Sequence, residues 1–168
     1  MKAAEITATT QRQRWMSILA KANAGAIEAA CKTLGELPQR QWLRPPQTGL
    51  LMVRGRIGGT GAKFNLGEVP VTRCALRLAS GTVGMAWVQG RDAQHAELAA
   101  QLDALLQEPA HHEQIRTQVI EPLAAQQAAR RDVAARKAAA TQVAFYTLAR
   151  EAGAINPVAN HTLTAEDS

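Results

Sequence analysis

The first part of the chain shows apolar side chains at helical intervals. This spacing runs through residues 9–21, where Thr9 is placed to cap the first turn, and again through residues 26–34. Gly35 follows the second run, where the end of a helix favours a residue that tolerates positive φ. We therefore expect two short helices at the start of the fold, preceded by a disordered segment over residues 1–8.

After residue 40 the apolar period shortens to two. Residues 50–57 alternate along a predicted strand, residues 69–78 form a second run, and a Ser-Gly turn leads into a third run over residues 82–89. This order indicates an antiparallel meander of three strands. Counting the short stretch 41–44 as a strand would make four.

The last part of the chain is predicted to be helical. Asp92 is placed to cap a helix whose leucines continue to a break at Pro109. Residues 113–150 are rich in helix-forming side chains, and Pro122 is expected to kink or divide that stretch.

These elements predict an α+β fold, with a small antiparallel sheet, two N-terminal helices and long C-terminal helices. We expect a single domain over residues 9–150. Residues 124–140 contain few large apolar side chains, so they are expected to form an extended helical arm that docks elsewhere. Residues 151–168 are predicted to be a disordered tail.

The composition points to a thin core. Hydrophobic residues make up 46% of the 168 positions, but only 4% are aromatic and alanine supplies much of the apolar count. Alanine buries little surface, so contact with a partner chain would add the apolar burial that such a core lacks. Cys31 and Cys74 have no disulfide-like spacing, and we interpret both as reduced, small apolar residues.

The sequence also favours a cytoplasmic location. No stretch approaches the roughly 20 apolar residues of a membrane-spanning helix, and the N-terminal residues lack the apolar core of a signal peptide.

The positive charge is concentrated in the middle of the chain. Residues 39–91 hold eight basic side chains against the single acid Glu68, a net charge of +7, whereas the whole chain carries only +5. The remaining residues are therefore slightly acidic. Such a field favours phosphate-bearing ligands or an acidic protein surface.

A glycine-rich stretch within this basic segment is the first candidate site. Gly58, Gly59 and Gly61 stand between the cations Arg56 and Lys63. Backbone N–H groups of consecutive glycines can converge on an anion, although the spacing is not that of a nucleotide-binding P-loop. Three interpretations stay open: a hairpin connection with solvated cations, a phosphate-contacting loop, and a loop that docks onto a partner.

The second candidate lies where the third predicted strand passes into a helix. Arg91 stands beside the expected helix N-terminus, a position suited to anions, and His95 follows one turn later. The alternative is that Asp92 simply caps the helix while His95 lies on its polar face.

The sequence offers little support for other chemistry. No nucleophile or second titratable group is spaced to converge on His95, so we predict no catalytic residue. The four histidines never combine with Cys or carboxylate at a ligand spacing, so we predict no metal site. A nucleic-acid or nucleotide binding module that uses the basic middle segment is the alternative function. The pairs Arg130-Arg131 and Arg136-Lys137 of the alanine-rich stretch could also face nucleic acid, but no aromatic side chains are interleaved with them for base stacking, so nucleic acid is disfavoured.

Several motifs taken together resemble the PhnG family, the G subunit of the bacterial carbon-phosphorus lyase system. They cover most of residues 12–150: Arg14-Trp15-Met16-Ser17, Thr48-Gly49-Leu50, RGRIGGTG over 54–61, Thr72-Arg73, GMAWVQGRDAQH over 84–95 with Ala96-Glu97, and Phe145-Tyr146. The chain departs from the family through an extension before Thr9 and a longer tail after Arg150.

The resemblance implies a role in phosphonate use. In that family the G subunit works with H, I and J subunits, two copies of each core chain, and an ATP-binding L subunit assists. The G, H and I group joins ATP to a phosphonate, displaces adenine and yields a ribose 1-phosphonate 5-triphosphate.

The resemblance assigns the reactive chemistry to other subunits. The nucleosidase chemistry belongs to the I subunit, and iron-sulfur and S-adenosylmethionine belong to the J subunit. We therefore expect a structural or assembly role for this chain, with no cofactor bound by the chain alone.

Overall fold

The computed structural model describes residues 2–142, which form an α+β fold. The described residues divide into two units, one ending at residue 129 and the other beginning at residue 130. The division falls inside the alanine-rich stretch 124–140, which has few bulky side chains for packing. A single domain over residues 9–150 stays a prediction. The predicted tail 151–168 lies outside the described residues.

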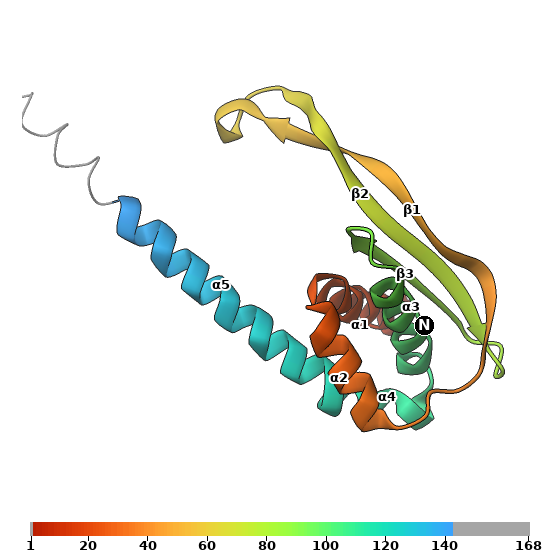
Figure 1. The fold of residues 1–168 in the computed structure, drawn as a ribbon. Helices are drawn as coiled ribbons and strands as arrows, with labels where there is room; N and C mark the ends of the chain where they lie inside the picture. Colours follow the sequence, from red (N-terminus) through yellow and green to blue (C-terminus); the bar gives the residue numbers. More distant parts are fainter. Residues whose placement is uncertain (1, 143–168) are drawn as a thin grey trace, which may run out of the picture. The chain divides into compact units, whose positions relative to one another are not determined.

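The sheet contains three antiparallel strands in the order β1-β2-β3 (Figure 1): Arg40–Arg56, Lys63–Leu78 and Val83–Gln89. The stretch 41–44, considered as a fourth strand, is the beginning of β1. Pro45 and Pro46 lie within β1, where the pairing with β2 is interrupted by register shifts. Proline lacks an N–H group, so it is tolerated on an edge strand at such an irregularity.

Strands β1 and β2 are much longer than β3. Strand β3 pairs with β2 only over residues 71–77. Beyond that point, residues 49–70 continue as two paired strands and their connection, and we call this segment the projecting hairpin (Figure 1). At its base, the Gly90 N–H donates to the Pro70 carbonyl at 2.8 Å.

Two helices open the fold, as predicted. Helix α1 spans Lys2–Lys21 and therefore begins seven residues before the predicted start at Thr9, so residues 2–8 are helical where disorder was expected. Helix α2 spans Ala24–Leu34, and the Asn23 side chain accepts from the Gly25 N–H at its start. Gly35 follows with φ 84°, which confirms the predicted helix end.

Helix α3 (Ala93–Leu106) covers one face of the sheet. Asp92 caps it as predicted, because its carboxylate accepts from the His95 N–H at 2.9 Å. The helix packs so closely on β3 that a Cβ at Gly84 would lie 2.0 Å from the Ala100 carbonyl oxygen. Only glycine fits that position without a shift of the backbone. The alanines buried nearby are Ala86, Ala96, Ala99, Ala100 and Ala104.

The predicted irregularity at Pro122 takes the form of a π-helical turn. Helix α4 (Pro109–Ile115) passes into the π segment Arg116–Ile120 and then into α5 (Glu121–Gln142). The Glu121 N–H bonds to the Arg116 carbonyl, five residues back. The widened turn ends two residues before Pro122, which has no N–H for an α-helical bond.

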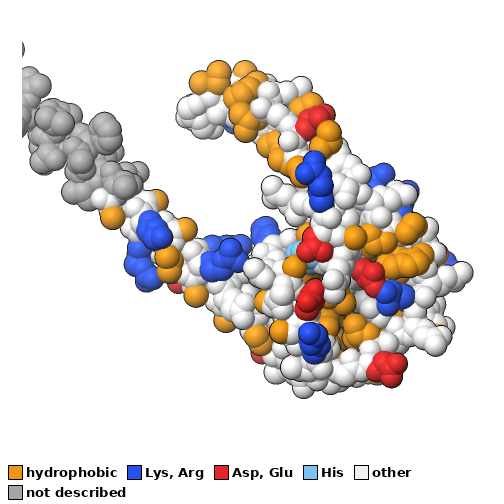
Figure 2. All heavy atoms as spheres, in the orientation of Figure 1, with side chains coloured by type: hydrophobic (Ala, Val, Ile, Leu, Met, Phe, Trp, Pro, Cys, Tyr) orange, Lys and Arg blue, Asp and Glu red, His pale blue; other side chains and the backbone are white. Residues whose placement is uncertain are grey.

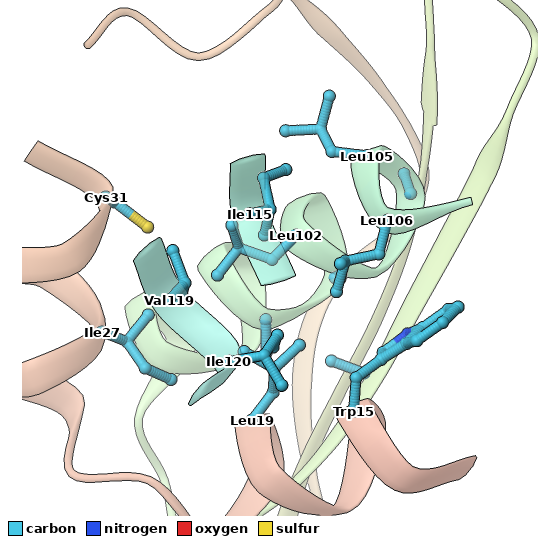
Figure 3. Packing of buried hydrophobic residues seen from close by; sticks show 14 of the residues in the cluster. Trp15, Leu19, Ile27, Cys31, Leu102, Leu105, Leu106, Ile115, Val119 and Ile120 are labelled. Carbon is cyan, nitrogen blue, oxygen red and sulfur yellow. The ribbon is translucent and has the colours of Figure 1, made fainter. Parts of the chain in front are cut away.

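Leucine, isoleucine and tryptophan side chains from the helices fill the core (Figure 3). Leu19 of α1, Ile27 of α2, Leu102 of α3 and Val119 of the π segment are almost completely buried together. Thus segments from both ends of the described chain share one core. In the described part of the chain, no helix has both the length and the apolar character to cross a bilayer.

A buried carboxylate ties α1 to α3 and the sheet. Asp103 is completely buried and accepts from Arg12 at 2.7 and 3.1 Å, from Trp15 Nε1 at 2.9 Å and from the Met85 backbone N–H at 3.1 Å. The last bond satisfies a donor on β3, which is the edge strand on that side of the sheet. Four donors and an ion pair compensate for removing this charge from water.

Candidate interaction surface

The projecting hairpin exposes large apolar side chains. Leu50, Leu66 and Ile57 retain 64%, 66% and 74% of their accessible surface, and Leu51, Met52 and Phe64 are also exposed. Figure 2 shows hydrophobic side chains along the hairpin, interspersed with charged ones. Soluble proteins rarely expose so many neighbouring apolar groups unless the surface binds something.

These side chains occupy both faces of the hairpin. Leu51 pairs with Val69, whereas the adjacent Leu50 pairs with Pro70, and adjacent residues of a strand point to opposite faces. In this region helix α3 covers neither face, since the residues from Leu50 to Glu68 are all exposed or half-buried. The apolar surface is therefore two-sided.

One face of the hairpin borders a hollow of about 580 Å³. Leu51, Val69 and Val71 line it from the hairpin and its base, and Trp87 lines it from β3. Residues 20–22 at the end of α1 form the opposite wall. The hollow therefore combines apolar strand residues with a helix end that carries Lys21.

Two arginines stack on tryptophan rings of the sheet outside the projecting hairpin, Arg73 near its base and Arg40 at the opposite end of β1. The Arg73 guanidinium lies 5.5 Å from the centre of the Trp87 ring, and Arg40 lies 5.3 Å from that of Trp42. Arg40 also forms an ion pair with Glu97. Stacking holds Arg73 over an apolar ring while leaving its charge available to an acidic partner, whereas the charge of Arg40 is paired with Glu97.

The glycine stretch forms the connection at the hairpin tip, which agrees with the hairpin interpretation. Gly58 and Gly59 have φ of 60° and 80°, in the region that favours glycine. The Gly61 N–H donates to the Ile57 carbonyl, and Arg56 donates to the Gly61 carbonyl at 3.0 Å. Arg56 therefore braces the turn, while Lys63 is exposed at the start of β2.

The second group of candidate residues divides into one exposed and one buried residue. Arg91 is exposed beside the start of α3. His95 is buried, contrary to the expectation of a polar-face position, and its Nε2 lies 2.8 Å from the Leu19 carbonyl. Its ring thus connects α3 to the end of α1.

The two groups of candidate residues do not form one site. Gly90, next to Arg91, bonds to Pro70 of β2. Lys63 lies seven residues before Pro70 in the same strand. At roughly 3.3 Å per residue, the strand separates the two groups by about 23 Å. A single phosphate therefore cannot contact both.

The buried cysteines have unreactive surroundings. Cys31 and Cys74 are free and buried, which confirms their interpretation as reduced apolar residues. Burial raises the pKa of each thiol to about 11, and Glu28 adds to the effect at Cys31. The Cys74 thiol donates to the Ala96 carbonyl at 3.1 Å. Within residues 2–142, no three His, Cys, Asp or Glu side chains form a group suited to a metal ion.

The sequence analysis singled out the cations of this segment but overlooked its apolar residues as a surface. The signal was present in the Leu-Leu-Met-Val run over residues 50–53, which is apolar at consecutive positions and so on both faces of a strand. The apolar side chains of such a strand are buried only if a layer of protein covers each of its two faces. Nothing in the sequence showed that the helices would stop short of it.

Comparison with known proteins assigns the chain to a family. The family model described as phosphonate metabolism protein PhnG matches residues 10–151 of this chain. The alpha-D-ribose 1-methylphosphonate 5-triphosphate synthase subunit PhnG of Rhizobium meliloti (strain 1021) is 40% identical over 153 residues, covering 89% of this chain and 95% of the relative. The chain therefore belongs to the PhnG family.

Proposed function

We propose that this chain is a subunit of an alpha-D-ribose 1-methylphosphonate 5-triphosphate synthase and that it has a structural role in that assembly. The name of the Rhizobium meliloti relative supports the assembly. The observation that supports a structural role is the projecting hairpin, which carries apolar side chains on both faces with no covering layer in the described residues.

The proposed assembly contains H, I and J subunits, two copies of each, and operates in the cytoplasm as part of carbon-phosphorus lyase metabolism. ATP is a substrate of the whole complex. Iron-sulfur and S-adenosylmethionine are assigned to another subunit, and no catalytic residue is proposed in this chain. The proposal is consistent with the buried positions of His95, Cys31 and Cys74, which leave these groups poorly placed to meet a substrate.

Affinity purification of the tagged full-length chain from bacteria growing on a phosphonate tests this role. We expect the H, I and J subunits to copurify in fixed stoichiometry, measured by mass spectrometry and light scattering. Release of adenine from ATP and methylphosphonate is then compared between the complex, supplemented with the L subunit, and the isolated chain. Adenine release by the isolated chain, or its recovery as a free monomer, would contradict the proposal.

A further inference from the structure

We infer that the projecting hairpin, residues 49–70, is the docking element of this chain, and that its occupant is a different protein chain with an apolar contact surface bordered by acidic side chains. The inference rests on the proposed subunit role and adds the surface and the chemistry of the partner. It starts from exposure: Leu50, Leu66 and Ile57 are each about two-thirds exposed or more.

An isolated two-stranded hairpin is marginally stable in water. The part of β1 and β2 beyond β3 is such a hairpin, because only β2 pairs with β1 there. Covering its apolar faces with another chain would remove apolar surface from water and so stabilise the hairpin. The hollow lined by Leu51, Val69 and Trp87 offers one face a concave seat for apolar side chains of the partner.

The backbone favours a protein as the occupant over a lipid bilayer. Strand β1 lies at the edge of the sheet, and no backbone hydrogen bond to its outer side occurs among the described residues. Those N–H and carbonyl groups would be unsatisfied in hydrocarbon, at a cost that excludes open sheet edges from membranes. A neighbouring polypeptide can satisfy them with its own polar groups.

The side chains also disfavour nucleic acid. Single strands stack their bases on aromatic rings, and duplexes are held mainly through phosphates. The hairpin instead exposes aliphatic side chains, and Phe64 is its single aromatic residue. Apolar aliphatic groups gain most when they are covered by other apolar groups, as in a protein interface.

Charge decides against a second copy of the same chain. The hairpin itself carries Arg54, Arg56 and Lys63 against Glu68, and it lies within the segment of net charge +7. Two copies meeting through this surface would bring like charges together. Acidic side chains at the rim of the occupant would place negative charge opposite Arg54 and Lys63. A chain of different sequence can supply them, so we infer that the occupant is a different protein.

The test measures assembly of purified full-length variants with the co-expressed H, I and J subunits. The apolar variant combines Leu50→Ser with Leu66→Ser, and the charge variant combines Arg54→Glu with Lys63→Glu. We expect roughly 100-fold weaker binding for the first and about tenfold for the second. Increasing salt should weaken wild-type binding more than that of the charge variant. Lys32→Glu on the exposed side of α2 is the matched control and should assemble normally.

The outcomes separate the inference from the proposed function. If the wild-type chain assembles and both hairpin variants bind equally well, the docking inference is wrong while the subunit role stands. If the wild-type chain does not assemble at all, the subunit role is wrong. The inference would also be overturned by a different occupant of the hairpin. Such an occupant would be shown by hairpin-dependent binding to vesicles containing phosphatidylglycerol, by binding to single-stranded DNA, or by self-association of the isolated chain. Unchanged thermal unfolding of the variants shows that their loss of binding is not a loss of folding.

Discussion

Two parts of the same sheet illustrate what a covering layer of helices does. Where β2 and β3 lie under α3, every second residue is buried: Thr72, Cys74, Leu76 and Leu78 point inward and their neighbours do not. In the projecting hairpin no position is buried, although its residues are at least as apolar. The comparison shows that apolar character alone does not define a core. A second packed layer from the same chain is also required.

The largest expected effect concerns Asp103 in the covered part. Replacing Asp103→Ala removes the acceptor of the Trp15 and Met85 N–H groups and leaves Arg12 without its partner. We expect a loss of about 3–5 kcal/mol in the free energy of unfolding, measured by urea denaturation. Asp92→Ala, which removes only a helix cap, is the control and should cost about 1 kcal/mol. Equal losses in the two variants would show that the buried network contributes little.

The next effect concerns the close approach of helix and strand. Gly84→Ala places a methyl group against the Ala100 carbonyl and the Ala104 side chain, so α3 must move away from β3. We expect a loss of about 1–3 kcal/mol, visible as a lower urea midpoint. Gly49→Ala is the control, because nothing lies within 4 Å of its Cβ position. A stable Gly84→Ala protein with an unchanged midpoint would contradict the packing described above.

A smaller effect is expected from the buried thiols at alkaline pH. Their pKa is raised to about 11 in the folded chain from an ordinary value of 9.0, so the unfolded chain loses these protons first. The stabilisation is complete below pH 9 and is lost as the pH rises towards about 11. Thermal unfolding between pH 8 and 11 should therefore decline less steeply in a Cys31→Ala, Cys74→Ala variant than in the wild type. Parallel pH profiles would show that the thiols are not responsible.

The smallest effect on stability is expected in the projecting hairpin. Leu50→Ser and Leu66→Ser alter side chains that are already mostly in water, so the free energy of unfolding should change by no more than about 0.5 kcal/mol. Leu102→Ser in α3 is the opposite case, because Leu102 is fully buried and its loss should destabilise strongly. A large destabilisation by the hairpin substitutions would mean that the hairpin belongs to the core of this chain.

Much of the fold could be predicted from local patterns. The caps at Asp92 and Gly35, the two opening helices and the antiparallel meander all follow from residue type and spacing. The predicted strand starts at residues 50 and 69 were too late, because β1 begins at Arg40 and β2 at Lys63. Backbone pairing between two strands can continue past the residues in which apolar and polar side chains alternate clearly. Prolines are tolerated on an edge strand.

The candidate site was predicted only in part. The cations Arg56 and Lys63 and the glycines between them do lie on an exposed hairpin. His95 was considered either as a contact for an anion or as part of the polar face of the helix, but its ring lies in the core and bonds to the Leu19 carbonyl. Histidine is polar enough for either environment, so only the position of α1 beside α3 determined which it occupies.

The sequence by itself determined the local elements of this protein and the charge of its middle segment, because caps, turns and alternation depend on neighbouring residues. Tertiary structure alone decided which apolar residues became core. Helices α1 and α3 pack over the short strand β3, and the same kind of residues one segment further along β1 and β2 stay exposed. Burial depends on which surfaces meet, and that is a property of the assembled chain and its partners.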